Sequence, residues 1–211
     1  MNRTARRLAL ALGFLATAGL LPGCGSGKDP EVERVDRLRE QKNTAALQQE
    51  IDKKDPKIST LAVRSLAQLG PEARPQIERA MQDTRSEIRR EAAAVYPQTS
   101  TGPAAPALAA VARTDPDAAV RAVAVTSLGR MRALDEMETL LAAVEEPDPL
   151  VRQRASDSIA LIMGARYDFR GTNAERHRTV AEVRKACRDQ MEILRKYYQT
   201  KPNPPPKSPA R

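Results

Sequence analysis

Apolar side chains recur three or four positions apart in short segments along most of this chain. The segments are separated by turns that are rich in acidic residues and proline. In residues 118–131, for example, Val120, Ala124 and Leu128 follow one another at intervals of four, which is the period of one helix face. No segment has the strict alternation of a β-strand that would compete with this interpretation. The pattern therefore predicts an all-helical chain.

One combination of turn and helix occurs several times. An acidic residue opens a turn, usually with a proline, and an aliphatic residue followed by arginine comes about five positions later. Copies lie at residues 83–96, 115–129 and 146–159, and a looser copy lies at 55–70. The equivalent aliphatic positions are separated by 30, 32 and 31 residues, at Ile58, Ile88, Val120 and Val151. A fixed period of roughly 20 to 50 residues indicates a solenoid of stacked helical units.

The apolar spacing places four helix pairs within residues 43–165. We expect helices at about 44–53 and 56–69, 75–81 and 86–96, 104–112 and 118–131, and 135–144 and 150–163. Gly70 followed by Pro71 ends the second of these helices, and Pro97 ends the fourth at or before Tyr96.

The repeated residues resemble those of HEAT repeats, in particular the short type first associated with phycobilisome lyases. The signature is DP, then VR, then A-x-x-x-L-G, at Asp115, Pro116, Val120, Arg121, Ala124, Leu128 and Gly129. The resemblance implies an all-α fold, a short right-handed α–α superhelix (a HEAT-like solenoid) with a long C-terminal capping helix. Scaffolds, adaptors and lyase-like proteins share such repeats, so the architecture alone does not name an activity.

Further helices are expected at both ends of the repeats. Asp29 followed by Pro30 is a helix start, so residues 24–42 are predicted to hold a short tether and an N-terminal capping helix. Residues 166–199 are predicted to form a C-terminal cap: a loop in which Tyr167 and Phe169 fill the junction, and a long helix opened by a capping box at Thr172. Residues 200–211 are rich in proline and are predicted to be a disordered tail.

The first 23 residues have the pattern of a secretory signal. Three arginines lie within residues 1–7, and residues 8–21 are uncharged and mostly apolar, which is shorter than the roughly 20 apolar residues of a membrane-spanning helix. The sequence Leu21-Pro22-Gly23-Cys24 then resembles a bacterial lipobox. The resemblance implies cleavage before Cys24 and attachment of lipid to its sulfur, whereas an ordinary cleaved signal and an uncleaved anchor are the alternatives. Two or three acyl chains would hold the protein stably at a membrane, because each buried methylene contributes about 0.8 kcal/mol.

The formal charge is +8 for the whole chain, and removal of the leader with its three arginines lowers it to +5. Such a charge is compatible with anionic lipid, acidic proteins or nucleic acid. Nucleic-acid binding would call for aromatic side chains that stack on bases, but only 3% of residues are aromatic. No nucleic-acid partner is expected.

Arginine occupies one repeat position three times, each about six residues after an acid. The acids are Asp83, Asp115 and Glu146, and the arginines are Arg89, Arg121 and Arg152. In HEAT-type stacks this position resembles a buried ladder, in which arginine bonds the turn acid of its own or a neighbouring repeat, since its planar fork satisfies two acceptors at once. A basic stripe for an anionic ligand is the alternative.

Other arginines have no acid at a fixed spacing. Arg64, Arg90 and Arg154 are therefore the candidate partner surface, on the face formed by the second helices of the pairs. The alternative is that they are isolated solvated charges.

Few residues are suited to catalysis or metal binding. Cys187 is the only cysteine besides Cys24 and lies on an apolar helix stripe, where a buried hydrophobic role is expected. His177 is the only histidine, so a multi-histidine metal site and a histidine-based triad are excluded. No catalytic residue, metal or other cofactor is expected.

These observations predict a bacterial envelope lipoprotein, lipid-anchored to a membrane, whose HEAT-like body is a scaffold or adaptor for an unknown protein partner in the envelope. Two other hypotheses stay open. One is a lyase-like protein that acts on a small ligand, which a deep pocket with several ionisable groups would favour. The other is a structural envelope protein that binds anionic polymer or lipid.

Overall fold

The computed structural model describes residues 29–100 and 105–200. Within these ranges the chain forms ten α-helices and three one-turn 3₁₀ helices, at Gly70–Ala73, Tyr96–Gln98 and Leu134–Glu136, and no β-strand. The predictions of a signal peptide, of a lipid on Cys24 and of a proline-rich tail concern residues outside the described ranges.

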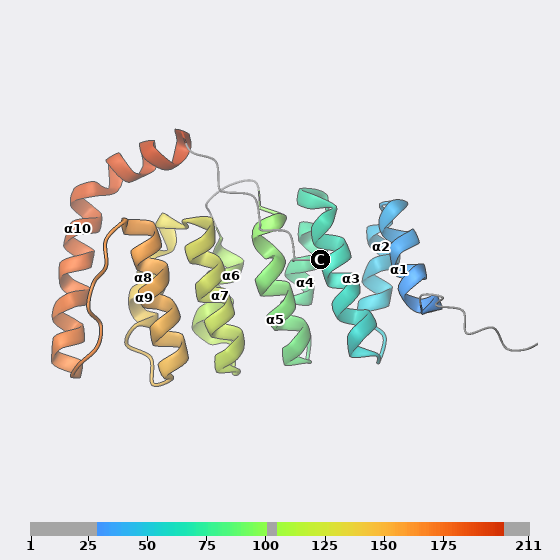
Figure 1. Cartoon of the computed structure of the whole chain (residues 1–211), viewed down its shortest axis with the longest axis horizontal. Helices are drawn as coiled ribbons and strands as arrows, with labels where there is room; N and C mark the ends of the chain where they lie inside the picture. Colours follow the sequence, from blue (N-terminus) through green and yellow to red (C-terminus); the bar gives the residue numbers. More distant parts are fainter. Residues whose placement is uncertain (1–28, 101–104, 201–211) are drawn as a thin grey trace, which may run out of the picture.

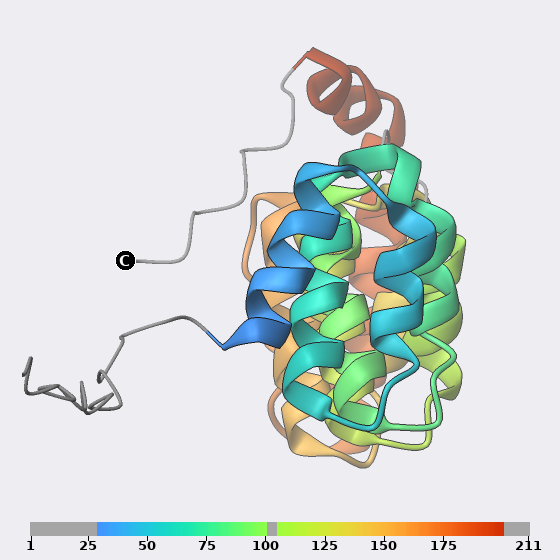
Figure 2. The same ribbon diagram turned by 90° about the vertical axis from the view of Figure 1, so that its right-hand side faces the viewer.

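The helices form a two-layered stack that runs in chain order from one end of the molecule to the other (Figure 1). The first helices of the pairs, which we call the A layer, are α2 (Thr44–Ile51), α4 (Arg74–Ala80), α6 (Pro106–Thr114) and α8 (Met137–Ala143). The second helices, the B layer, are α3 (Pro56–Gln68), α5 (Ser86–Val95), α7 (Ala118–Met131) and α9 (Pro149–Met163). Each B helix packs on its own A helix, and α3, α5 and α7 each pack on the B helix that follows. The view along the stack shows both layers (Figure 2).

The turn residues define where the B helices begin. Asp55, Asp117 and Asp148 are the N-cap residues of α3, α7 and α9, and their side chains accept hydrogen bonds from backbone N–H groups of the first turn. This satisfies donors that have no partner within the helix. Gly70 follows α3 with φ of +82°, a conformation that glycine adopts without steric cost. The first helix of the fourth pair begins at Met137 because residues 134–136 form a 3₁₀ turn.

Small residues bring the B helices close together. Ser127 Oγ of α7 donates to the Ala93 carbonyl of α5 at 2.8 Å, and Ser158 Oγ of α9 donates to the Val125 carbonyl of α7 at 3.0 Å. Gly129 faces Ser158 so closely that a Cβ on the glycine would lie 2.6 Å from the Ser158 Cβ. The core contains many alanines beside leucine and isoleucine. The close contact between neighbouring B helices depends on small side chains at these positions.

Helices at both ends cover the stack. α1 (Pro30–Glu40) packs against α2 and α3 and buries Val35. α10 (Asn173–Thr200) packs against α8, buries Val180, Val183 and Cys187, and bends so that its last turns fold over the edge of the array (Figure 1).

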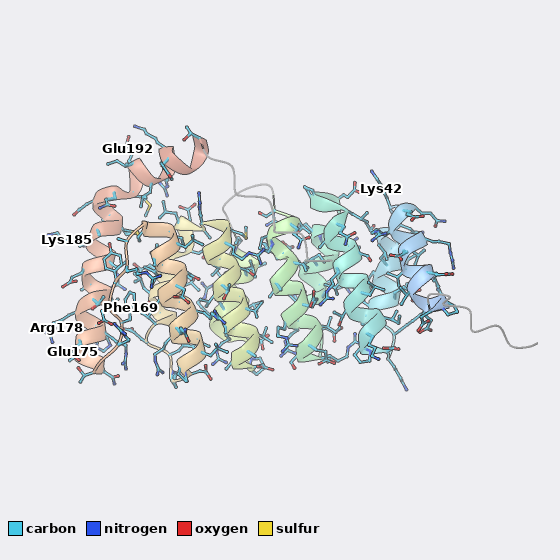
Figure 3. All side chains as sticks on the ribbon, viewed as in Figure 1. Lys42, Phe169, Glu175, Arg178, Lys185 and Glu192 are labelled. Atoms are coloured by element: carbon cyan, nitrogen blue, oxygen red, sulfur yellow. The ribbon has the colours of Figure 1, made fainter. Side chains whose placement is uncertain are left out.

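The outer side of α10 is charged and exposed, as Figure 3 shows for Glu175, Arg178, Lys185 and Glu192. On its inner side, Arg184 Nη2 donates to Glu138 Oε2 of α8 at 2.8 Å. The helix therefore has one face for the stack and one for solvent, as expected of a cap.

Candidate functional site

The arginine of the second repeat joins two consecutive turns. Arg89, on α5, donates through Nε and Nη2 to the two carboxylate oxygens of Asp115 in the next turn, at 2.7 and 2.9 Å. Its Nη1 donates to the backbone carbonyls of Asp83 and Thr84 in its own turn, at 2.9 and 3.1 Å. The Asp115 side chain is only 4% exposed and that of Arg89 12%. The Arg89 guanidinium thus binds the backbone of its own turn and the acidic side chain of the following turn.

The third repeat uses the same arrangement. Arg121, on α7, binds both oxygens of Glu146 through Nε and Nη2 at 2.9–3.1 Å. Its Nη1 donates to the Asp115 carbonyl at 2.9 Å. We call this series the arginine ladder: Arg89 with Asp115, Arg121 with Glu146, and Arg152 at the end.

Asp115 is held in the charged form. Burial alone would raise the pKa of Asp115, but the hydrogen bonds from Arg89 and from the Asp117 backbone, together with the charges of Arg89 and Arg121, lower it below its ordinary value. The hydrogen bonds between a charged carboxylate and an arginine guanidinium are stronger than hydrogen bonds between neutral groups.

The first step of the ladder is built differently. Ser59 stands where the other repeats have arginine, and Arg85 of the next turn takes its place. Arg85 donates through Nη2 to the Ile51 carbonyl and through Nη1 to the Lys53 carbonyl, both at 2.7 Å, and also binds Asp83. The sequence grouped Asp83 with Arg89, but the Asp83 carboxylate binds Arg85 and only its backbone carbonyl binds Arg89.

The last ladder arginine uses only one side of its guanidinium in the described part of the chain. Arg152, on α9, donates through Nη1 to the Glu146 carbonyl at 2.7 Å and to the Pro147 carbonyl. From there to residue 200, no further turn of the array follows it. Within residues 29–100 and 105–200, its Nε and Nη2 have no hydrogen-bond or ion-pair partner.

A groove of about 660 Å³ lies beside this arginine, between α9 and the loop of residues 166–171. Its charged lining consists of Arg152, Arg166, Arg170 and Arg176 with the acids Asp157 and Asp168. The Asp168 carboxylate binds Arg170 at 3.1 Å. The Arg176 guanidinium donates to the Gly171 carbonyl and the Asn173 side chain.

The loop also seals the last repeat. Phe169 is 7% exposed and lies between α9 and α10 (Figure 3), and Tyr167 packs partly buried against the same core. The capping box after it is formed, because the Thr172 backbone N–H donates to Glu175 Oε2 at 2.7 Å. The loop thus packs its two aromatic side chains against the end of the stack, and the capping box begins α10.

The three candidate surface arginines do not form one cluster. Arg64 binds the carboxylate of Glu91 on α5 through Nε and Nη2, at 2.6 and 3.1 Å. Arg64 has no acid at the spacing of the arginine ladder, and stacking brings it a partner from 27 positions away. Arg90 on α5 and Arg154 on α9 are exposed, and neither has an ion pair with any residue that the structure describes.

Two residues that bond across repeats, Arg85 and Glu91, were missed by the sequence reasoning. Ser59 in the arginine position was a signal that its turn needs another donor. Glu91 had no such signal, since neither its type nor its spacing is repeated.

Other groups offer little chemistry. Cys187 is buried, its Sγ lies 3.7 Å from the Met163 sulfur, and burial raises the pKa of its thiol. His177 Nε2 contacts a Glu145 carboxylate oxygen at 3.1 Å. In the described ranges no group of three or more His, Cys, Asp or Glu side chains could hold a metal ion. Among these residues, no helix combines the length and the apolar character that crossing a membrane requires.

Comparison with known proteins gives one family match, to HEAT repeats, over residues 105–168. No curated protein matches the chain. Among solved structures, the crystal structure of an engineered protein is similar with a TM-score of 0.41 and 15% identity, over 78% of this chain and 84% of that one. The family match covers α6 to α9, which carry Arg121 and Arg152 of the arginine ladder, and the helix pairs α2–α3 and α4–α5 precede it. The described chain is thus a HEAT-like α-solenoid.

Proposed function

We propose that this protein is a lipid-anchored scaffold of the bacterial cell envelope, whose solenoid docks a protein partner. HEAT repeats suggest a role in protein interaction. A stack of helices offers an extended surface that exists before binding, and little conformational entropy is lost when a partner docks on a rigid surface.

The observation that carries the docking proposal is a stripe on α9. Leu150 is 42% exposed and Leu161 47% exposed. Together with exposed Arg154 they lie on one side of the helix, since four and eleven residues correspond to nearly whole turns. Single exposed leucines are ordinary, but aliphatic side chains around an unpaired arginine have the composition of a protein interface.

A site-specific cross-linker tests this docking surface. A photoreactive residue at Arg154 should capture a defined protein in intact cells. The same residue at Arg178, which is exposed on the outer side of α10, is the matched control and should not. Equal capture from both positions, or none from Arg154, would contradict docking on α9.

The anchor is proposed from the leader and from Cys24, and membrane fractionation tests it. The native protein should sediment with membranes, and its intact mass should fit a chain that begins at Cys24 and carries acyl groups. The Cys24→Ser variant should lose the lipid mass and the membrane association. Unchanged membrane binding by that variant would remove the anchor from the proposal.

The two other hypotheses predict different results. A structural protein that binds anionic lipid or polymer should bind anionic vesicles in a lipid-free form, and should be released by salt, because exposed charges are screened over about 8 Å at physiological ionic strength. A lyase-like protein should show turnover that is lost on changing one residue of the repeats.

A further inference from the structure

The arginine ladder stops with an unfilled step at the C-terminal end. All three ladder arginines place Nη1 on the carbonyls of their own turn. In Arg89 and Arg121 the Nε–Nη2 edge then binds the carboxylate of the next turn. In Arg152 the same edge has no partner among the described residues, and the residue lines an open groove.

No nearby acid among residues 29–100 and 105–200 completes the step. The loop of residues 166–171 follows α9 where a further turn of the array would supply its acid. The acid of this loop, Asp168, binds Arg170 at 3.1 Å. Asp157, on the groove side of α9, makes no ion pair with Arg152. Arg152 is partly buried and lines an open groove, so an external carboxylate that enters the groove gains the bidentate bond that the loop does not provide.

We propose that the groove between α9 and residues 166–171 binds an acidic side chain of a partner protein, with the Asp or Glu carboxylate on Nε and Nη2 of Arg152. The ligand chemistry follows from the ladder, since Asp115 and Glu146 occupy the equivalent place on the two preceding arginines. Four arginines against two aspartates make the groove basic, and Arg166 has no ion pair with a described residue. Its volume of about 660 Å³ accommodates several residues of a peptide.

This inference rests on the docking part of the proposed function, because it states the chemistry of the partner, and it is independent of the lipid anchor. The ladder itself provides a probe. A peptide of sequence VEEPDP, taken from residues 144–149, carries the acid that binds Arg121 in its natural turn. In one control peptide glutamine replaces the second glutamate, VEQPDP; in the other it replaces the first, VQEPDP, so that the two controls have the same net charge.

Fluorescence anisotropy of the labelled peptides with the full-length Cys24→Ser chain measures the binding. VEEPDP and VQEPDP should bind the protein, and VEQPDP should bind about tenfold more weakly, because one charge-assisted bidentate bond is lost. Arg152→Gln should reduce the binding of VEEPDP about tenfold, whereas Arg178→Gln, on the exposed outer side of α10, should leave it unchanged.

Arg152 also holds carbonyls of its own turn, so a second variant avoids disturbing them. Ser156→Glu introduces a carboxylate into the groove one helical turn after Arg152, and should compete with the peptide while leaving thermal unfolding nearly unchanged. Peptide binding that survives both Arg152→Gln and Ser156→Glu would overturn the inference, as would equal affinity for VEQPDP and VQEPDP. Displacement of VEEPDP by inorganic phosphate at micromolar concentration would instead assign the groove to a phosphate ligand.

The two proposals fail in distinguishable ways. If the cross-linker at Arg154 captures a partner but VEEPDP does not bind, the scaffold stands and the carboxylate site is wrong. If VEEPDP binds through Arg152 but no partner is captured in cells, the site stands and docking on α9 is wrong.

Discussion

Two arginine–carboxylate pairs in this protein have the same bidentate geometry but different exposure, and their contributions to stability should differ. Arg89 with Asp115 is the inner pair, with side chains 12% and 4% exposed. Arg64 with Glu91 is the outer pair, with side chains 58% and 19% exposed. Each joins neighbouring B-layer helices or turns, so solvent screening is the main difference between them. Double-mutant cycles with alanine measure each pair's coupling energy.

The structure sets the expected magnitudes. Asp115→Ala removes two bonds from Arg89 and one from the Asp117 backbone N–H, and leaves a largely buried guanidinium without its acid. We expect a loss of about 3 kcal/mol in the free energy of unfolding, and a coupling energy of about 2 kcal/mol with Arg89→Ala. For Arg64 and Glu91, water replaces the lost partner, so a coupling energy of about 0.5 kcal/mol is expected.

Urea unfolding of the full-length chain, followed by circular dichroism, gives the four free energies of each cycle. Raising the salt concentration should lower the small coupling of Arg64 with Glu91 and change that of Arg89 with Asp115 little, because screening acts on exposed charges. Equal coupling energies for the two pairs, or a larger one for the outer pair, would refute the argument that burial makes the ladder stabilising.

Three further predictions follow from single contacts. The pKa of Asp115 is lowered in the folded protein, so the charged side chain should make the protein more stable than its Asp115→Asn variant. This extra stability is complete above the unfolded-state pKa of about 3.9 and is lost as pH falls through the folded-state pKa. A difference in unfolding free energy that does not change with pH would contradict this. Gly129→Ala should destabilise by about 2 kcal/mol, since its Cβ would lie 2.8 Å from the Ser158 Cα and overpacking outweighs the gain in helix propensity; a raised melting temperature would contradict it. Thr172→Ala should cost about 1 kcal/mol and speed hydrogen exchange in the first turn of α10, and unchanged exchange there would show that the cap contributes nothing.

The predicted helices agree with the structure to within about two residues at their ends. The B helices were the most accurate: α7 was expected at 118–131 and lies there, because its turn aspartate and its apolar period act within a few residues of the chain. The A helices were less accurate. α6 begins at Pro106 and not at 104, and α8 begins after a 3₁₀ turn, since these short helices lack a side-chain cap that marks the start.

The pattern of neighbouring residues in the sequence thus determined the all-helical class, the repeat period and the register that places arginine at equivalent positions. Helix periodicity and capping involve residues no more than about four apart, so they can be read from neighbours in sequence. The same register left open whether Arg89 bonds its own turn or the next one.

Stacking decided the pairings. Arg89 binds Asp115 and Arg64 binds Glu91, which lie 26 and 27 residues further along the chain. At such separations the type of a side chain does not predict its partner. The separation between B helices depends on contacts such as Gly129 with Ser158, and it brings each guanidinium within reach of the following turn. That Arg152 ends the ladder without an acid among the described residues is also a tertiary result, because the chain after α9 leaves the repeat path and the Asp168 carboxylate of its loop binds Arg170.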